Sequence, residues 1–267
     1  MHSRKVDYRL MSKYYDETRV PLIEDVLEPC LSKIADLGKI SVGSIVLDVG
    51  CGTGIYTIPL AEKTGAMVFG LDSSKEMIER AKMKEDSQTA KWLIGDAENL
   101  PFDNARFDCV FMTLVIHQIV NKKKALDEVY RVLRQNGTIV VMTKSHGQLK
   151  RSVVADFPKT RQIDLRRFPT IPILKDMLSS AGFEDTRYYL VSAGIAKVSI
   201  EDYLDKTRKK FISTLTLLSE EEFRKGFKIF EKKLREKWGN EVVYKKEYTF
   251  VVGERYKKAL KTCPELA

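Results

Sequence analysis

A short glycine-rich segment, Asp48-Val-Gly-Cys-Gly-Thr-Gly54, follows a run of apolar, β-branched residues and precedes a stretch of helical period. Glycine has no Cβ atom, so glycines at 50, 52 and 54 let the backbone bend sharply and approach a ligand closely. A helix that starts just beyond them presents free backbone N–H groups to that ligand. The segment therefore predicts the first strand-to-helix turn of an α/β fold with a ligand site at this turn.

The surrounding sequence alternates between apolar runs and helical segments, which is typical of βαβ units around a parallel sheet. We expect strands over residues 45–49, 67–71, 90–94, 107–113, 138–143, 183–191 and 246–254, and helices over 56–63, 74–84, 122–133 and 172–181. The predicted fold class is α/β, with a doubly wound, mostly parallel, seven-stranded, Rossmann-like sheet. Sheets of this kind bind ligands at the carboxyl ends of their strands.

Two acidic residues follow the next two predicted strands. Asp72 ends the second strand, where a carboxylate can accept hydrogen bonds from both hydroxyls of a ribose. Asp96, in Gly95-Asp-Ala97, follows the third strand. A dinucleotide-binding fold predicts the first of these acids but not the second.

Five motifs, in order, resemble those of the class I S-adenosylmethionine-dependent methyltransferases, within the small-molecule group called type 11. They are Asp48–Gly54, Gly70-Leu-Asp-Ser-Ser-Lys-Glu-Met77, Gly95-Asp-Ala-Glu-Asn-Leu-Pro-Phe102, Phe107-Asp108 and Glu128-Val-Tyr-Arg-Val-Leu133. The resemblance is close over residues 14–143 and departs at Arg134-Gln-Asn-Gly137, a remote turn where relatives usually read Lys-Pro-Gly-Gly. It implies the Rossmann-like methyltransferase sheet, S-adenosyl-L-methionine as cofactor, S-adenosyl-L-homocysteine as product and a small-molecule methyl acceptor.

The resemblance also implies a role for each matching residue. The backbone at Gly50, Cys51, Gly52 and Gly54 would pass beside the methionine part of the cofactor, and Asp48 would hold the turn or meet the amino group of the cofactor through water. Asp72 would bind the ribose, Ser73 and Met77 would border the adenine, and Asp96 and Ala97 would bind the adenine. Thr113 would line the passage for the methyl group, and Tyr15 and Arg19 would close over the cofactor. Arg19 is the candidate partner of the cofactor carboxylate. Cys51 is expected to pack rather than to act as a nucleophile.

Each candidate residue for the acceptor side has a structural alternative. His117 follows the fourth predicted strand, where a neutral imidazole can act as a general base; a wall residue or a helix-start hydrogen bond is the alternative. Tyr14 either covers the site or packs within a helix. His146, Arg161, Arg166 and Arg167 lie where the loop after the fifth strand should overlook an acceptor, and they either contact an anionic substrate or form solvated surface. No metal site is expected.

A segment of helical period, residues 199–239, separates the last two predicted strands. It carries two apolar stripes: Leu204, Phe211, Leu215 and Leu218, then Phe223, Phe227, Phe230, Leu234 and Trp238. The simplest interpretation is a seam by which a helical cap packs, and the alternative is an apolar acceptor pocket under the second stripe. Ser219 and Glu222 predict a capping box at the start of the second helix.

We therefore expect four parts: a helical segment over the cofactor at 1–40, a core at 41–192 with a substrate-side loop at 144–170, a helical cap at 193–242, and the last core strand with a tail at 243–267. Four scattered cysteines without a C-x-x-C pair fit a reducing compartment. The longest apolar run, 109–116, is too short to span a bilayer, and the first residues carry charge where a signal peptide is apolar. These features predict a cytoplasmic protein and leave its oligomeric state open.

The chain is basic, with 46 Lys and Arg against 37 Asp and Glu, a net charge of +9. Residues 143–267 account for the excess, with 27 basic and 17 acidic side chains. This distribution favours an anionic acceptor, and it keeps an RNA-directed methyltransferase or nucleic-acid-binding protein as an alternative. A nicotinamide-dependent oxidoreductase is less favoured, because the glycines follow G-x-G-x-G rather than G-x-G-x-x-G.

Overall fold

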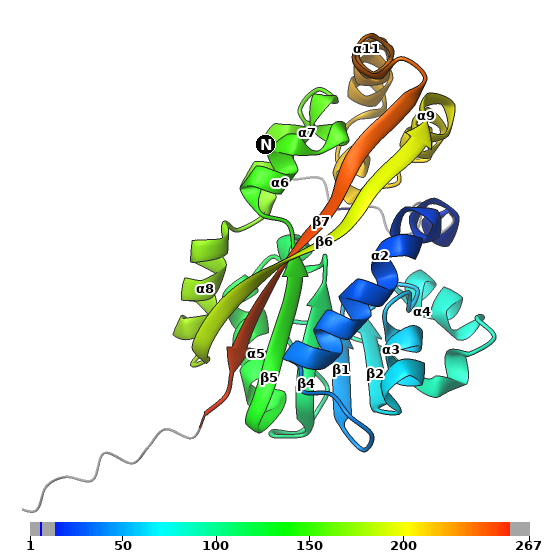
Figure 1. The fold of residues 1–267 in the computed structure, drawn as a ribbon. Coiled ribbons are helices and arrows are strands. Elements are labelled where there is room, and N and C mark those ends of the chain that lie inside the picture. Colours follow the sequence, from blue (N-terminus) through cyan, green and yellow to red (C-terminus); the bar gives the residue numbers. More distant parts are fainter. Residues whose placement is uncertain (1–5, 7–13, 257–267) are drawn as a thin grey trace, which may run out of the picture.

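The alternating apolar runs of the sequence form a single seven-stranded sheet (Figure 1). The computed structural model describes residue 6 and residues 14–256, without the side chains of residues 19–25 and 193. The strands are β1 (Ile45–Val49), β2 (Met67–Asp72), β3 (Ala90–Ile94), β4 (Phe107–Thr113), β5 (Leu133–Thr143), β6 (Glu184–Ser199) and β7 (Glu241–Glu254). Their order is β3-β2-β1-β4-β5-β7-β6, with β1 to β5 parallel and β7 antiparallel to both of its neighbours. The doubly wound, mostly parallel sheet is confirmed.

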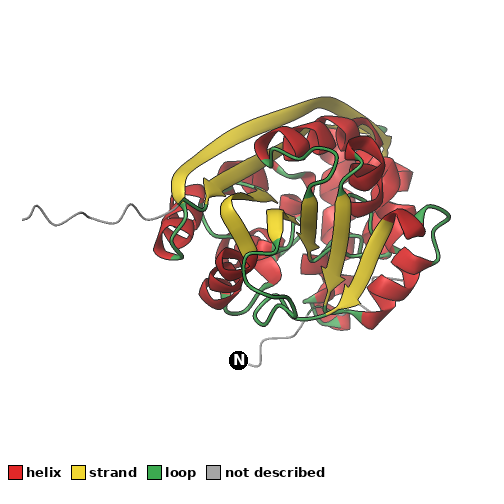
Figure 2. Cartoon of the chain, turned by 90° about the horizontal axis from the view of Figure 1, so that it is seen from below, coloured by secondary structure: helices red, strands yellow, loops and turns green. Residues whose placement is uncertain are grey.

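Helices cover both faces of the sheet (Figure 2). On one face lie α2 (Tyr15–Leu37) and α3 (Thr57–Thr64), and on the other lie α5 (Lys122–Val132) and α8 (Ile171–Ser180). The shorter α4 (Lys75–Lys82) and η1 (Ser87–Thr89) pack beside the β2–β3 edge. Ser74 caps α4 as predicted, because its hydroxyl accepts a hydrogen bond from Met77 N.

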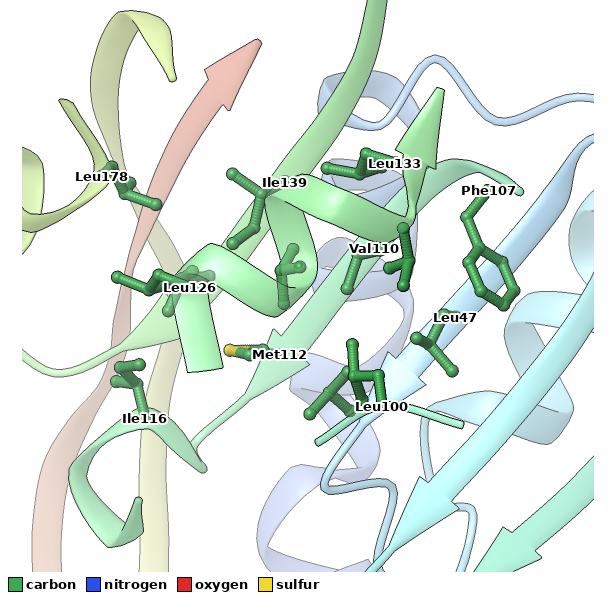
Figure 3. Close-up of a cluster of buried hydrophobic side chains, with 14 of the residues drawn as sticks. Leu47, Leu100, Phe107, Val110, Met112, Ile116, Leu126, Leu133, Ile139 and Leu178 are labelled. Atoms are coloured by element: carbon green, nitrogen blue, oxygen red, sulfur yellow. The ribbon is translucent and has the colours of Figure 1, made fainter. Parts of the chain in front are cut away.

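The core beneath α5 and α8 fixes the strands that carry the glycine-rich turn. Leu47 of β1, Val110 of β4 and Ile139 of β5 meet Leu126 of α5 and Leu178 of α8, and all five side chains are fully buried (Figure 3). Burial of each such side chain stabilises the fold by about 1.5–3 kcal/mol. This packing holds β1 beside β4, so the turns that follow these two strands lie at one edge of the sheet.

The last two strands are longer than the sequence predicts, and they rise as a hairpin beyond the other strands (Figure 1). Pairing runs from Glu184 with Glu254 to Ser199 with Glu241, and the register shifts between Ser192 and Ile195. Small residues at 192–194 interrupt the alternating pattern there, which is why the sequence predicts an earlier end. The helical insertion consequently spans residues 200–240 instead of 193–242, as α9 (Ile200–Arg208), α10 (Ser213–Thr216) and α11 (Glu220–Trp238).

The segment 144–170, predicted as a loop, is instead helical. It forms α6 (His146–Arg151), η3 (Val153–Asp156) and α7 (Thr160–Arg167). A capping box between Ser145 and Gln148 starts α6. Val153, Val154 and Phe157 pack into the apolar core of the cap, so this segment belongs to the same layer as α9 and α11. The sequence predicts a loop here because charged residues far outnumber the few apolar residues that pack this segment against the cap.

The two apolar stripes of the insertion form the predicted seam. Leu204, Leu215, Phe230 and Leu234 are buried in one cluster, and the capping box of Ser219 and Glu222 starts α11 as expected. Within residues 14–256, no helix combines the length and apolarity that a membrane span requires.

Gly226 of α11 lies in this seam, so a substitution at this position tests the packing. A Cβ atom at residue 226 would lie 2.5 Å from Cε1 of Phe157, so the two segments approach closely only because glycine stands there. Alanine normally stabilises a helix over glycine by about 1 kcal/mol. We expect Gly226→Ala to destabilise the protein instead, by about 1–3 kcal/mol, because the Phe157 ring must move. Urea unfolding measures the change, with exposed Lys228→Ala as the control; a gain in stability from Gly226→Ala would contradict the packing.

Candidate active site

A cavity of about 1740 Å³ lies between the carboxyl ends of the strands and the cap. This exceeds the roughly 300–1,000 Å³ of a site for one small ligand. We call the lining residues numbered 6–98 the N-terminal wall and those numbered 113–248 the C-terminal wall. The N-terminal wall comes mainly from the turns after β1, β2 and β3, with Val6, Tyr15 of α2 and Met77 of α4. The C-terminal wall comes from the turn after β4, from α6 to α7, from the cap and from β7.

The three glycines of the first turn have different surroundings. Cβ atoms at Gly50 and Gly54 would lie 2.3 Å from Val115 and 2.4 Å from Trp92, so these glycines allow tight packing between loops. At Gly52, with φ at +55°, a Cβ atom would meet only the ring of Tyr15, at 3.8 Å. Gly50 and Gly52 line the cavity, whereas Gly54 does not. The expected close approach to a ligand therefore fits Gly50 and Gly52.

Asp48 supports the turn from within the sheet. Its side chain is fully buried, and Oδ2 accepts a hydrogen bond of 2.7 Å from the Thr57 hydroxyl at the start of α3. Oδ1 has no hydrogen-bond partner among the described residues. Burial raises the pKa of Asp48 to about 8, and the charge of Asp72 adds to this effect. Asp48 does not line the cavity, so the geometry favours a structural role, in which it fastens the start of α3 behind the turn.

Asp72 ties the turn after β2 to the glycine turn. Its carboxylate accepts hydrogen bonds from Gly52 N at 2.9 Å and from Ser74 N at 2.8 Å. Burial raises the pKa of Asp72, while these backbone donors oppose the rise. The exposed Ser73 and the buried Met77 line the cavity beside it. A carboxylate held in this way keeps free lone pairs for the hydroxyls of a ligand.

The turns after β3 and β4 complete the edge. Asp96 is exposed on the N-terminal wall, where its Oδ1 accepts from Glu98 N at 2.9 Å, and Ala97 lies next to it. Thr113 ends β4 on the C-terminal wall. Leu114 follows with a φ of +52°, a strained conformation for a residue with a branched side chain.

The start of α2 is fastened to the glycine turn. Tyr15 lines the cavity, and the neighbouring Asp16 accepts hydrogen bonds from the Thr53 hydroxyl at 2.5 Å and from Lys84 Nζ at 3.3 Å. Tyr14 does not line the cavity and lies near Lys209 of the cap. The side chain of Arg19 lies outside the described residues, so its predicted carboxylate contact stays a prediction.

His117 lies in η2 (Ile116–Gln118), on the C-terminal wall. It is 7% exposed, and its ring stacks on Phe168 with 3.7 Å between centroids and 11° between planes. Phe168 follows α7, and its backbone oxygen lies 2.8 Å from Nε2 of His146. The sequence did not indicate this stack, because the two rings are 51 positions apart. Phe168 thus holds the imidazole in one orientation.

The basic residues predicted for the acceptor side separate into two groups. Arg166 and Arg167 line the cavity, and Arg167 donates to the Ser213 hydroxyl at 3.2 Å and to the Thr214 hydroxyl at 3.1 Å. His146 and Arg161 do not line it. Arg161 pairs with Asp156 at 3.8 Å, and His146 contacts Phe168 as described. The geometry therefore favours structural roles for His146 and Arg161.

Sequence reasoning missed several lysines of the C-terminal wall. Lys122 begins α5, Lys144 follows β5, and Lys246 lies on β7 with only 7% of its surface exposed. The C-terminal wall has eight basic and four acidic side chains, a net of +4, whereas the N-terminal wall has three acids and no base, a net of −3. Lys144 directly follows a predicted strand and Lys122 starts a predicted helix, a signal that could have identified them.

Cys51 is buried, and burial together with the charges of Asp48 and Asp72 raises the pKa of its thiol well above the usual value. A protonated buried thiol is a poor nucleophile, so the packing role is favoured. Within the described residues, no group of three or more His, Cys, Asp or Glu side chains is arranged to hold a metal ion.

A parallel sheet with a glycine turn, a ribose-type carboxylate and a further acid defines a Rossmann-like enzyme that binds a nucleoside-containing cofactor. The family model described as a methyltransferase domain matches residues 47–141. The demethylmenaquinone methyltransferase of Staphylococcus epidermidis is 32% identical over 185 residues, which cover 61% of this chain and 77% of that protein. The chain belongs to the class I S-adenosylmethionine-dependent methyltransferases, and its cofactor is S-adenosylmethionine.

Two further comparisons extend this result. The bifunctional biotin biosynthesis protein BioHC of Cellvibrio japonicus is 33% identical over 139 residues, 52% of this chain, and this chain spans 27% of BioHC. A crystal structure from Anabaena variabilis, described as a methyltransferase of an antibiotic biosynthesis pathway, has a TM-score of 0.67 at 23% identity and covers 84% of this chain and 96% of that one. At this low sequence identity, the similarity to the Anabaena variabilis structure supports the fold alone.

The cysteines offer a test of the packing role of Cys51. In a Cys263→Ser background, which removes the cysteine outside the described residues, we expect native protein to react with a disulfide reagent about 100-fold more slowly than urea-unfolded protein. The reason is that Cys30, Cys51 and Cys109 are all buried. Absorbance at the thiolate product band measures the rate. Rapid labelling of Cys51 in the native state, located by peptide mass mapping, would contradict the packing role.

Proposed function

We propose that this methyltransferase transfers the methyl group to a small, anionic acceptor that binds between the sheet edge and the cap. The opposite charges of the two cavity walls carry this proposal. The N-terminal wall has a net charge of −3, which suits the cationic cofactor, and the C-terminal wall has a net charge of +4. A cavity larger than a single-ligand site leaves room for both molecules.

The N-terminal wall supplies the cofactor contacts in this proposal. Asp72 accepts from the ribose hydroxyls, because its oxygens are fixed by Gly52 N and Ser74 N. Met77 and Ser73 border the adenine, and Asp96 with Ala97 binds its edge. The turn at Gly50 and Gly52 lies beside the methionine part, under the ring of Tyr15. These residues fit the cofactor, since the turn leaves open space at Gly52 and the acids face the same cavity.

When bound, S-adenosylmethionine would supply a methyl group on a sulfonium sulfur; the acceptor atom would bond to this carbon in line as its bond to sulfur breaks, with S-adenosylhomocysteine as the leaving group. The chain therefore has mainly to align the acceptor, exclude water and remove a proton where the acceptor carries one. Thr113 lines the passage at the end of β4, and the cap covers the acceptor side. His117 is the general base, since it lies four residues beyond Thr113 on the same wall and Phe168 holds its ring.

The relatives support a small-molecule acceptor. The Staphylococcus epidermidis relative acts on demethylmenaquinone, a small molecule with a quinone ring. In this chain Tyr203, Tyr244 and Tyr248 line the C-terminal wall, so an apolar ring can pack near the basic side chains.

Asp72 provides the test of the cofactor site. We expect Asp72→Ala to weaken binding of S-adenosylhomocysteine by about 100-fold, because two hydrogen bonds to a charged acceptor are lost. Isothermal titration calorimetry measures the affinity, and circular dichroism checks the fold. The exposed Asp86→Ala variant, with the same loss of charge, should bind normally. Undiminished binding by Asp72→Ala would refute the assignment.

His117 provides the test of the chemical step. We expect His117→Asn to slow methyl transfer by about 10²–10⁴-fold while the affinity for S-adenosylhomocysteine stays within about twofold. Mass spectrometry of a metabolite extract incubated with isotope-labelled cofactor identifies the product and gives the rate. Gln118→Ala, which changes the next residue of the same wall, is the control. Equal rates for the wild type and His117→Asn would remove the base role.

A further inference from the structure

Three basic residues of the C-terminal wall converge from separate elements. Lys122 comes from the first turn of α5, Lys144 from the end of β5 and Arg167 from the end of α7, and all three line the cavity. We call them the basic cluster. They lie near one another because Arg167 directly precedes Phe168, which stacks on His117, and Lys122 follows His117 by five residues. Lys144 lies two residues beyond Met142, which pairs with Thr113 at the end of β4. The charge of Arg167 also lowers the pKa of Lys122, after the larger effect of burial. Lys144 and Arg167 both act on the buried carboxyl of Asp164.

Each member of the basic cluster is held by the fold. Arg167 donates to the Ser213 and Thr214 hydroxyls and lies 4.0 Å from Asp164, which itself accepts from Thr214. Lys122 Nζ donates to the backbone oxygen of Ile119 at 2.8 Å. Lys144 lies over the Tyr248 ring, with Nζ 5.5 Å from its centroid. Side chains held in this way lose little rotamer entropy when a ligand binds.

Two acidic side chains lie beside the basic cluster. Asp164 lies beside Arg167, and Glu98 lies near Lys122 while accepting from Asn121 N at 2.8 Å. The C-terminal wall as a whole keeps a net charge of +4. Arranging like charges together in a half-buried place costs free energy, and an anion bound among them offsets this cost.

The basic cluster is next to the proposed base. Phe168, which stacks on His117, directly follows Arg167, and Lys122 follows His117 by five residues through η2 and the start of α5. An anionic group bound here therefore places the rest of the acceptor against His117 and Thr113.

We propose that Lys122, Lys144 and Arg167 bind an anionic oxo group, a carboxylate or a phosphate, of the methyl acceptor. This inference rests on the proposed function and names the part of the acceptor that the wall recognises. Arg167 presents a planar fork to two oxygens, and the two lysines supply point charges. The acceptor class is thus a small acid or phosphate ester with its methyl-accepting atom close to the anionic group.

The test uses inorganic phosphate and acetate as probes of the full-length protein. Each is titrated, with and without saturating S-adenosylhomocysteine, at 0.15 M sodium chloride, where charges beyond about 8 Å are screened. Phosphate is followed by ³¹P NMR and acetate by ¹³C NMR. The variants are Lys122→Gln and Lys144→Gln, both at partly exposed positions, and the control is Lys150→Gln, which removes one charge from an exposed position of α6 outside the cavity lining.

We expect saturable binding of at least one probe, weakened about tenfold by Lys122→Gln and by Lys144→Gln but less than twofold by Lys150→Gln. The probe that binds more tightly distinguishes phosphate from carboxylate recognition. Absence of saturable binding, or equal weakening by all three variants, overturns the inference. Calorimetry of S-adenosylhomocysteine is a separate readout: its failure overturns the proposed function, whereas the titrations without it still decide the inference.

Discussion

The hydrogen bonds of Asp72 are the interaction on which the site depends. One carboxylate, at the end of β2, accepts from Gly52 in the turn after β1 and from Ser74 at the start of α4. The backbone adds to this contact, because Gly50 N and Cys51 N both donate to the Leu71 oxygen. These hydrogen bonds consequently hold the glycine turn against the end of β2. The shape of the turn is fixed before a ligand arrives, which lowers the entropy that binding costs.

Much of the sheet could be predicted because its strands are short, apolar and bounded by turn residues. The predicted bounds of β1, β3 and β4 agree with the structure, and Ser74 and Ser219 cap the helices that their positions indicate. The end of β6 and the start of β7 could not be predicted, because half of this hairpin stands beyond the sheet core and its alternation is broken near Gly194. The helices within residues 144–170 could not be predicted either, because they are short and mostly polar. Only a few apolar residues, such as Val153 and Phe157, pack them against the cap.

The residues of the site also fall into a group that the sequence predicts and a group that it does not. Gly52, Asp72 and Asp96 could be found from the sequence, because each follows a strand and parallel strands end at one edge. The C-terminal wall could not, because its residues come together through the tertiary packing of the cap. Phe168 reaches His117 across 51 positions, and Lys246 faces the cavity only because the hairpin bends over it. Arg161 shows the converse, since a position in the expected segment did not bring it to the wall.

The helical insertion leaves and re-enters the hairpin at neighbouring points. Ile200 N donates to the Asn240 oxygen at 3.0 Å, so the two ends of the insertion are joined by a backbone hydrogen bond. An insertion with adjacent ends can change in length or sequence without displacing the strands on which it stands. The acceptor contacts that we propose for this segment can therefore diverge among descendants of the fold while the cofactor edge is inherited unchanged.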